Sequence, residues 1–197
     1  MGGLYLADIF VKEFLDYLNL IHHISAGAND AKSIQNITIN IAAIIQYKYF
    51  RSGQLATLKE ELLQTDLLIE VFKERFGAKL QFIKNIKKEA VSIYIPNYAV
   101  LAFVENALFH GLIPKEGDWK LTLKIDENEE AVQITVTDNG VGFEPLEYEK
   151  KNGSIGDVGT IDYVTTQFKT FYNDLGELHI SSSNDRGTQI NIVIPKV

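Results

Sequence analysis

Residues 137 to 143, which read TDNGVGF, combine groups that could hold a flat polar ligand. The run directly follows the alternating stretch VQITV, so we expect it at the end of a β-strand. The carboxylate of Asp138 can accept two hydrogen bonds, and Gly140 and Gly142 let the backbone approach a ligand closely. This combination suits the amino group of an adenine ring. AspAsnGly is also typical of an ordinary turn after an edge strand, and that alternative stays open.

A second group of candidate residues lies in the helical run ValGluAsnAlaLeuPheHisGly at 104 to 111, where His110 lies one turn beyond Asn106. An amide oxygen such as that of Asn106 can bind Mg²⁺, which typically takes its other oxygens from water and nucleotide phosphates. The alternative is structural. Asn106 could bond to the helix backbone, and His110 could be favoured at a helix C-terminus by the dipole.

ArgGlyThr at 186 to 188, between the last two strand-like runs, is the third group. Gly187 and Thr188 could contact a nucleotide, or they could simply form the turn of a hairpin. The nucleotide hypothesis requires that Asp138 and Asn106 face each other across one cleft.

Two amphipathic helices are predicted before these groups. Apolar side chains recur every three or four residues over 4 to 25 and again from Ala31 to about Phe50, with a break at 26 to 30. The apolar positions are Phe10, Phe14, Leu18 and Ile21 in the first helix and Ile34, Ile37, Ile41, Ile44 and Ile45 in the second. A two-helix hairpin buries little surface alone, so we expect a second copy to complete a four-helix bundle.

The rest of the chain predicts helices and antiparallel strands in separate blocks. Thr57 and Glu60 form a capping box that opens a helix ending at Gly77, and Pro96 is predicted to start the helix that carries Asn106. Strands are expected near 79 to 83, 91 to 95, 119 to 125 and 131 to 137, then a helix near 160 to 173 and two last strands. This order predicts an α+β fold with helices on one face of a mixed sheet.

Composition narrows the classes of function. The 197 residues are 46% hydrophobic and 23% charged, which is globular and long enough for two small domains. The net charge of −7 argues against a general nucleic-acid surface. The absence of cysteine excludes disulfides, thiolate metal sites and cysteine nucleophiles. No apolar run is long enough to cross a membrane, so we expect a cytoplasmic piece, with any membrane or sensor segment upstream in a parent protein.

In their order, the three groups resemble the N box, the G1 box and the late glycine box of the GHKL ATPase superfamily. Residues 57 to 80 and 95 to 111 also resemble the corresponding segments of LytS/YehU-type sensor histidine kinases. The resemblance implies a dimerisation and phosphoacceptor-like helical hairpin at 1 to 54. It implies a two-layer α/β sandwich of the Bergerat ATP-binding kind at 55 to 197.

The resemblance also implies roles for single residues, with ATP and Mg²⁺ as cofactors. Asp138 would bind the adenine amino group, Asn106 would coordinate the Mg²⁺ that bridges the phosphates, and Thr188 would lie near the adenine. Glu105 would be the acidic member of the N box. The full ATP-binding set implied is Glu105, Asn106, His110, Asp138, Gly140, Gly142, Gly159, Gly187 and Thr188.

Two parts of the chain depart from the family pattern. Lys12 stands where the family has its phosphoacceptor histidine, and a protonated lysine is a poor substitute for imidazole, so autophosphorylation there is predicted to be lost. His22 and His23 are the weaker candidate acceptors, with capping or packing of the helix end as the alternative. In the pocket, Phe109 replaces a basic residue, and Gly159 is the one glycine kept in the lid sequence at 158 to 161.

These observations lead to one expectation and two rivals. We expect a homodimeric, degenerate sensor histidine kinase that binds ATP and signals through its conformation, to a response regulator or through a true histidine kinase. The first rival is a non-catalytic interaction module that no longer binds nucleotide. An ATP-hydrolysing machine of the gyrase or chaperone kind is disfavoured, because Ala102 stands where those enzymes keep a glutamate.

Overall fold

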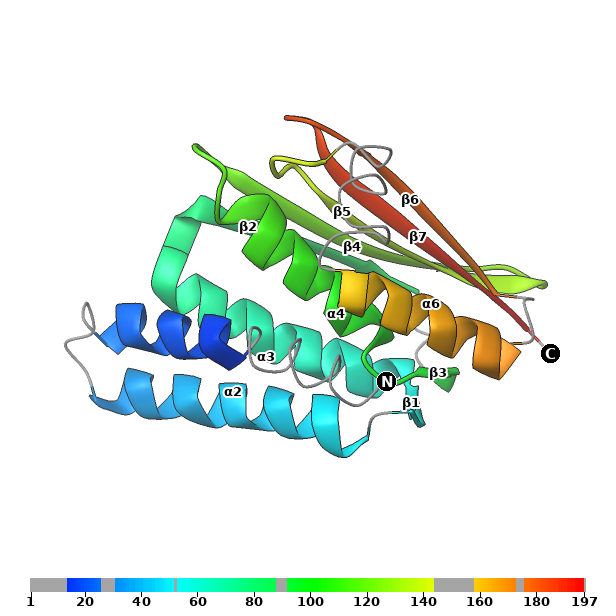
Figure 1. Ribbon diagram of the computed structural model, residues 1–197, viewed down its shortest axis with the longest axis horizontal. Coiled ribbons are helices and arrows are strands. Elements are labelled where there is room, and N and C mark those ends of the chain that lie inside the picture. The colour runs from blue at the N-terminus through cyan, green and yellow to red at the C-terminus, as the bar shows by residue number, and fades with distance from the viewer. Residues whose placement is uncertain are drawn as a thin grey trace.

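The computed structural model describes residues 14–25, 31–51, 53–87, 92–143, 158–172 and 176–196. Its largest element is a five-stranded sheet in the order β2-β4-β5-β7-β6 (Figure 1). The strands are β2 (Leu80–Ile86), β4 (Trp119–Glu127), β5 (Ala131–Asp138), β6 (Glu177–Ser183) and β7 (Gly187–Pro195). β2 runs parallel to β4 and the other pairs are antiparallel, so the predicted mixed sheet is confirmed.

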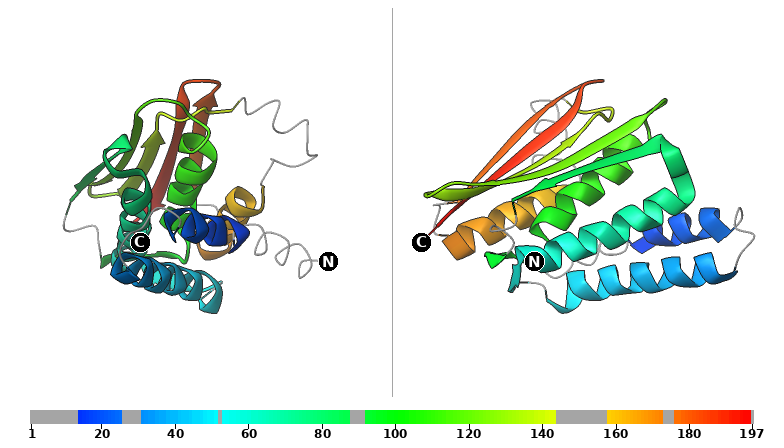
Figure 2. Two further views of the ribbon diagram at one scale, coloured as in Figure 1. Left: turned by 90° about the vertical axis from the view of Figure 1, so that its left-hand side faces the viewer. Right: turned by 180° about the vertical axis from the view of Figure 1, so that it is seen from behind.

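Three helices cover one face of this sheet: α3 (Leu58–Phe76), α4 (Ala99–Asn106) and α6 (Val158–Tyr172) (Figures 1 and 2). The strands alternate, so every second side chain faces the helices. The inward residues are buried: Leu121, Leu123 and Ile125 of β4, Val132, Ile134 and Val136 of β5, and Ile190, Ile192 and Ile194 of β7. The helices and the sheet form the predicted two-layer α+β arrangement.

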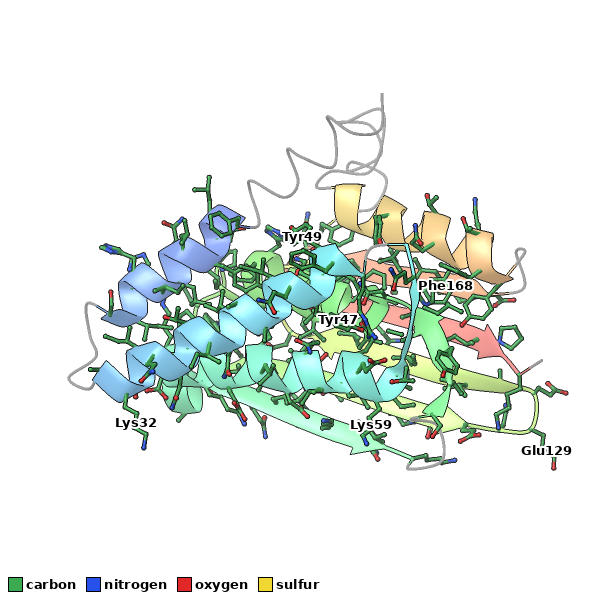
Figure 3. The ribbon with its side chains drawn as sticks, turned by 90° about the horizontal axis from the view of Figure 1, so that it is seen from below. Lys32, Tyr47, Tyr49, Lys59, Glu129 and Phe168 are labelled. Carbon is green, nitrogen blue, oxygen red and sulfur yellow. The ribbon has the colours of Figure 1, made fainter. Side chains whose placement is uncertain are left out.

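A further helical layer lies against α3 on its side away from the sheet (Figures 1 and 2). It consists of a helix at residues 14–25 and of α2 (Ala31–Phe50). Tyr47 of α2 lies among packed side chains, whereas Lys32 points away from the molecule (Figure 3). Side chains from both hairpin helices belong to the same hydrophobic core as those of α3 and α4. No helix among the described residues is long and apolar enough to cross a membrane.

Two residues of the apolar stripe predicted for the first helix face away from the chain's own core. Phe14 and Leu18 are 38% and 44% exposed, while Tyr17, Leu20 and Ile24 are buried. This helix is apolar on two sides, and the chain's own core takes the side that carries Tyr17. Phe10 lies outside the described residues.

The start of α3 follows the prediction closely. The Thr57 hydroxyl accepts a hydrogen bond from the Glu60 backbone N–H at 3.2 Å, and the Glu60 carboxylate accepts one from the Thr57 backbone N–H at 2.8 Å. The helix ends at Gly77, whose φ is 55°. The predicted capping box and helix end are confirmed.

The start of α4 was predicted wrongly. Pro96 is not its first residue but the last residue of β3 (Tyr94–Pro96), which pairs with β1 (Leu55–Thr57) in a two-stranded sheet. The residue before Ala99, Tyr98, has a left-handed φ of 68° and no side-chain cap. A proline at a helix start only removes one unpaired N–H, and here the remaining donors bond to a carboxylate distant in sequence.

That carboxylate belongs to Glu61 of α3, which is fully buried. It accepts hydrogen bonds from the backbone N–H groups of Tyr98, Val100 and Leu101 at 2.6, 2.9 and 3.0 Å, and one from the Tyr47 hydroxyl. Burial raises the pKa of Glu61, and these hydrogen bonds oppose that shift. The position of α4 is therefore fixed from α3.

Candidate functional site

A cavity of about 220 Å³ opens between the C-terminal end of α4 and the ends of β5 and β7. Five of the predicted site residues line it: Asn106, His110, Asp138, Gly142 and Thr188. Phe103, Val136 and Ile190 add apolar wall. No lysine or arginine is among the described residues that line it. The structure therefore brings the three sequence groups to one place, with apolar surface between their polar atoms.

Asp138, the last residue of β5, is the buried carboxylate of this cavity and is 6% exposed. Its Oδ1 accepts a hydrogen bond from the Gly140 backbone N–H at 2.7 Å, and the Thr188 backbone N–H also donates to the carboxylate. Burial raises the pKa of Asp138, and the two N–H donors partly offset that effect. A carboxylate has about four acceptor positions, so one side of Asp138 can still accept from a ligand.

Around Asp138, other backbone segments pass so close to two positions of the chain that only glycine fits there. A Cβ on Gly140 would lie 2.4 Å from the carbonyl carbon of Gly111, and one on Gly187 would lie 2.1 Å from the Asp138 carbonyl oxygen. Gly187 also has a φ of 81°, which favours glycine. Neither residue is among those lining the cavity. In this structure both set the position of Asp138.

The helix that carries Asn106 continues as a π-helical turn, Ala107–Leu112. The Ile113 backbone N–H donates to the Leu108 carbonyl at 3.0 Å, five residues back, which marks the wider turn. Its last part approaches the strand end, since the Val141 N–H donates to the Gly111 carbonyl at 2.9 Å. The turn sets where His110 and Gly111 meet the cavity. Spacing alone does not distinguish it from an α-helix.

Ser182 of β6 supports the third group and was not predicted. Its hydroxyl accepts from the Phe143 backbone N–H at 2.9 Å and lies 3.0 Å from the Thr188 hydroxyl. It joins the turn after β5 to the start of β7, next to the cavity. The three consecutive serines at the end of β6 could have indicated Ser182 in the sequence. A polar run at a strand end is usually exposed to solvent, however, so it did not predict a site residue.

Glu105 does not line this cavity. Its carboxylate points toward the hairpin, where it lies 2.8 Å from the ammonium of Lys48 in α2 and accepts hydrogen bonds from the hydroxyls of Tyr17 and Tyr98. Glu105 and Lys48 are 5% and 4% exposed. Sequence reasoning missed Lys48, although it continues the buried spacing of Ile41 and Ile44. The cluster joins the hairpin to α4.

Phe109 lies in an aromatic cluster rather than in the main cavity. Its ring meets those of Tyr17 and Phe72 edge to face, with centroids 5.6 and 5.1 Å away. At the position where the family pattern has a basic residue, Phe109 makes these ring contacts. The side chain therefore serves the joint between the hairpin, α3 and α4.

The remaining predicted residues lie elsewhere. His22 and His23 are exposed at the end of the helix at residues 14–25, with ring centroids 5.7 Å apart. Gly159 lies in the first turn of α6. Lys12 and Phe10 lie outside the described residues, as do 26–30 and 144–157. In the part of the chain that is described, no group of three or more His, Cys, Asp or Glu could hold a metal ion.

Known structures define the fold class of this chain. The histidine kinase domain from the blue-light activated histidine kinase of Erythrobacter litoralis EL346 matches with a TM-score of 0.53 and 17% identity, over 97% of this chain and 90% of that one. The nucleotide-free catalytic domain of histidine kinase ThkA matches with a TM-score of 0.52 and 15% identity, over 73% and 95% of the two chains. The fold is therefore that of the GHKL catalytic domains of histidine kinases.

Sequence comparison gives particular relatives. Sensor histidine kinase YpdA of Escherichia coli strain K12 is 29% identical over 181 residues, and sensor protein LytS of Bacillus subtilis strain 168 is 27% identical over 193. Each match covers 90% of this chain but only 31% of the relative. No protein-family model matches. The resemblance to sensor histidine kinases is thereby confirmed, and the chain spans about a third of the relatives' length.

Proposed function

We propose that this chain is the ATP-binding portion of a sensor histidine kinase-like protein. The observation that carries the proposal is that Asp138 and Asn106, from separate sequence groups, line one cavity with apolar wall between them. A carboxylate fixed by backbone donors can accept from the amino group of adenine, and the apolar walls suit the faces of the ring. Thr188 is the neighbouring hydroxyl on the adenine side.

A cavity of about 220 Å³ suits the purine rather than a whole nucleotide. We therefore expect the ribose and phosphates at its mouth, beside Asn106 and His110. Asn106 is half-buried and offers a neutral amide oxygen, a suitable ligand for Mg²⁺ held jointly with phosphates. The bound Mg²⁺ would offset the phosphate charge, which matters here because lysine and arginine are absent from the described cavity lining.

The hairpin is proposed to make the homodimer. Leu15, Leu18 and Ile39 lie on its two helices and are 52%, 44% and 57% exposed. Exposed apolar side chains on paired helices are typical of a helix-bundle interface, and a second copy of the hairpin would bury them. The proposed division is a dimerisation hairpin at 1 to 54 and an ATP-binding domain at 55 to 197.

Signalling is proposed to proceed without phosphorylation at the usual histidine position, which is Lys12 here. In the relatives' class, phosphate passes from ATP to a histidine and then to an aspartate of a response regulator. In this chain the acceptor histidine would come from a partner kinase, or the dimer would act through its conformation. The chain would form the cytosolic part of a longer protein whose membrane or sensor segments lie upstream.

Calorimetry with ADP and Mg²⁺ tests nucleotide binding. Asp138→Asn replaces a double acceptor by an amide, and losing one charge-assisted hydrogen bond should weaken binding about tenfold or more. Asp185→Asn is the matched control, because Asp185 is an exposed turn residue with a φ of 63° that asparagine also tolerates. Absence of heat at millimolar ADP would favour the rival interaction module.

A further inference from the structure

A second, small cavity of about 20 Å³ adjoins the nucleotide cavity. The two share Asn106 and His110, so this one borders the proposed metal end. Its other wall comes from the hairpin, through Asp16 and Tyr17. The hairpin therefore reaches the site in the same chain, at the point where the phosphates would lie.

The position of Asp16 is fixed by its neighbours. Tyr17 is 2% exposed, its hydroxyl donates to Glu105, and its ring packs edge to face on Phe109. Glu105 is the residue before Asn106, so the neighbours of Asp16 and Asn106 are hydrogen-bonded to each other. Lys48 closes the same cluster through its ion pair with Glu105. Asp16 therefore lies beside Asn106 because the buried side chains of Tyr17, Glu105 and Lys48 hold this part of the hairpin there.

Among the described residues, three carboxylates lie near this end of α4, and two of them are engaged. Asp138 accepts from the backbone at the purine end, and Glu105 is paired with Lys48 and two tyrosine hydroxyls. Asp16 is half-buried, and the structure gives it no hydrogen bond or ion pair among the described residues. Asp16 lines the small cavity together with Asn106 and His110.

We propose that Asp16 supplies a carboxylate ligand, direct or through one water, to the Mg²⁺ held by Asn106. This inference rests on the proposed nucleotide site. Mg²⁺ in proteins is usually held by one or two carboxylates together with phosphate oxygens, and the amide of Asn106 alone provides no negative charge. Metal-bound nucleotide would then tie the hairpin to the ATP-binding domain, because both contribute a ligand to one ion.

The test compares ADP binding with Mg²⁺ and in EDTA, by calorimetry, for wild type, Asp16→Asn and Asp118→Asn. Asp118 is an exposed aspartate outside both cavities and serves as the control. Loss of a metal-site group typically weakens metal affinity about 10- to 100-fold. We expect Asp16→Asn to weaken ADP binding about tenfold with Mg²⁺ and to leave it unchanged in EDTA. Asp118→Asn should match wild type in both buffers.

A second measurement does not depend on the first. Mn²⁺ paramagnetic resonance with ADP reports the metal directly, and Asp16→Asn should release more free Mn²⁺ than wild type at equal concentrations. If Mg²⁺ raises the ADP affinity of Asp16→Asn as much as that of wild type, or more, Asp16 is not a ligand of the metal. That result would leave the proposed nucleotide site unaffected. If the wild type does not bind ADP in either buffer, both proposals are overturned.

Discussion

The two sides of α4 hold polar groups in different ways. On the cavity side, Asp138 is fixed by the backbone N–H groups of Gly140 and Thr188. On the hairpin side, side chains of the described residues hold Glu105, namely those of Lys48 and two tyrosines. Backbone donors remain after a side-chain substitution, whereas a side-chain cluster fails when one charge is removed. The first arrangement suits a permanent binding site, and the second suits a joint between two parts.

The largest effect is expected from Lys48→Met on the hairpin side. The substitution leaves the Glu105 carboxylate buried without its ion-pair partner, which typically costs about 3 to 5 kcal/mol. Urea unfolding followed by circular dichroism measures the loss. The double variant Lys48→Met with Glu105→Gln should recover most of it, because no buried charge is left unpaired. A single-variant cost below about 1 kcal/mol would contradict a buried ion pair here.

Glu61 shares features with both arrangements, because its side chain comes from a helix distant in sequence and its hydrogen-bond donors include backbone N–H groups. Glu61→Gln turns an NH₂ group toward N–H groups that need an acceptor, so we expect a loss of about 2 to 3 kcal/mol in urea unfolding. Glu61→Ala is the comparison that removes the acceptor without adding a donor. If Glu61→Gln unfolds like wild type, the carboxylate does not hold the start of α4.

The pH dependence of stability tests the same residue. The folded pKa of Glu61 is raised by burial above its unfolded value. Its contribution is therefore fully present below the unfolded pKa and is lost as the pH rises through the folded pKa. Subtracting the Glu61→Gln profile from that of wild type should leave a stability difference that declines with rising pH across this window. A difference that grows with pH would contradict the raised pKa.

On the cavity side, the corresponding test is a glycine substitution that alters the backbone around Asp138. Gly187→Ala forces a side chain into a left-handed position and against the Asp138 carbonyl, and strain of this kind costs about 1 to 3 kcal/mol. We expect weaker ADP binding as well, since Asp138 must shift. Gly117→Ala is the control, because Gly117 has a similar φ of 78° but open space around its Cβ position. Equal effects of the two variants would show that close packing at Asp138 is unimportant.

The parts that the sequence predicted correctly are those set by neighbouring residues. The Thr57 and Glu60 capping box and the alternation of β4 and β5 need only local hydrogen bonds and a period of two. The grouping of Asp138 with Asn106 was predicted through family resemblance, since spacing cannot bring two segments together. Its ligand stays a prediction.

The parts that were missed depend on contacts distant in sequence. The start of α4 is determined by Glu61, which is on another helix, so Pro96 was a misleading local signal. The partner of Glu105 is Lys48, and pairing across the hairpin is not visible in either segment alone. The chain's own core takes the side of the first helix that carries Tyr17 rather than the side that carries Leu18, and helical spacing does not show which side is taken.

A crystal structure with a non-hydrolysable ATP analogue and Mg²⁺ is the most direct test of the central claim. We predict that the adenine amino group donates to the Asp138 carboxylate and that the amide oxygen of Asn106 reaches the metal ion, directly or through one water. A ligand bound elsewhere, or a cavity filled by protein side chains at millimolar analogue, would contradict the nucleotide site.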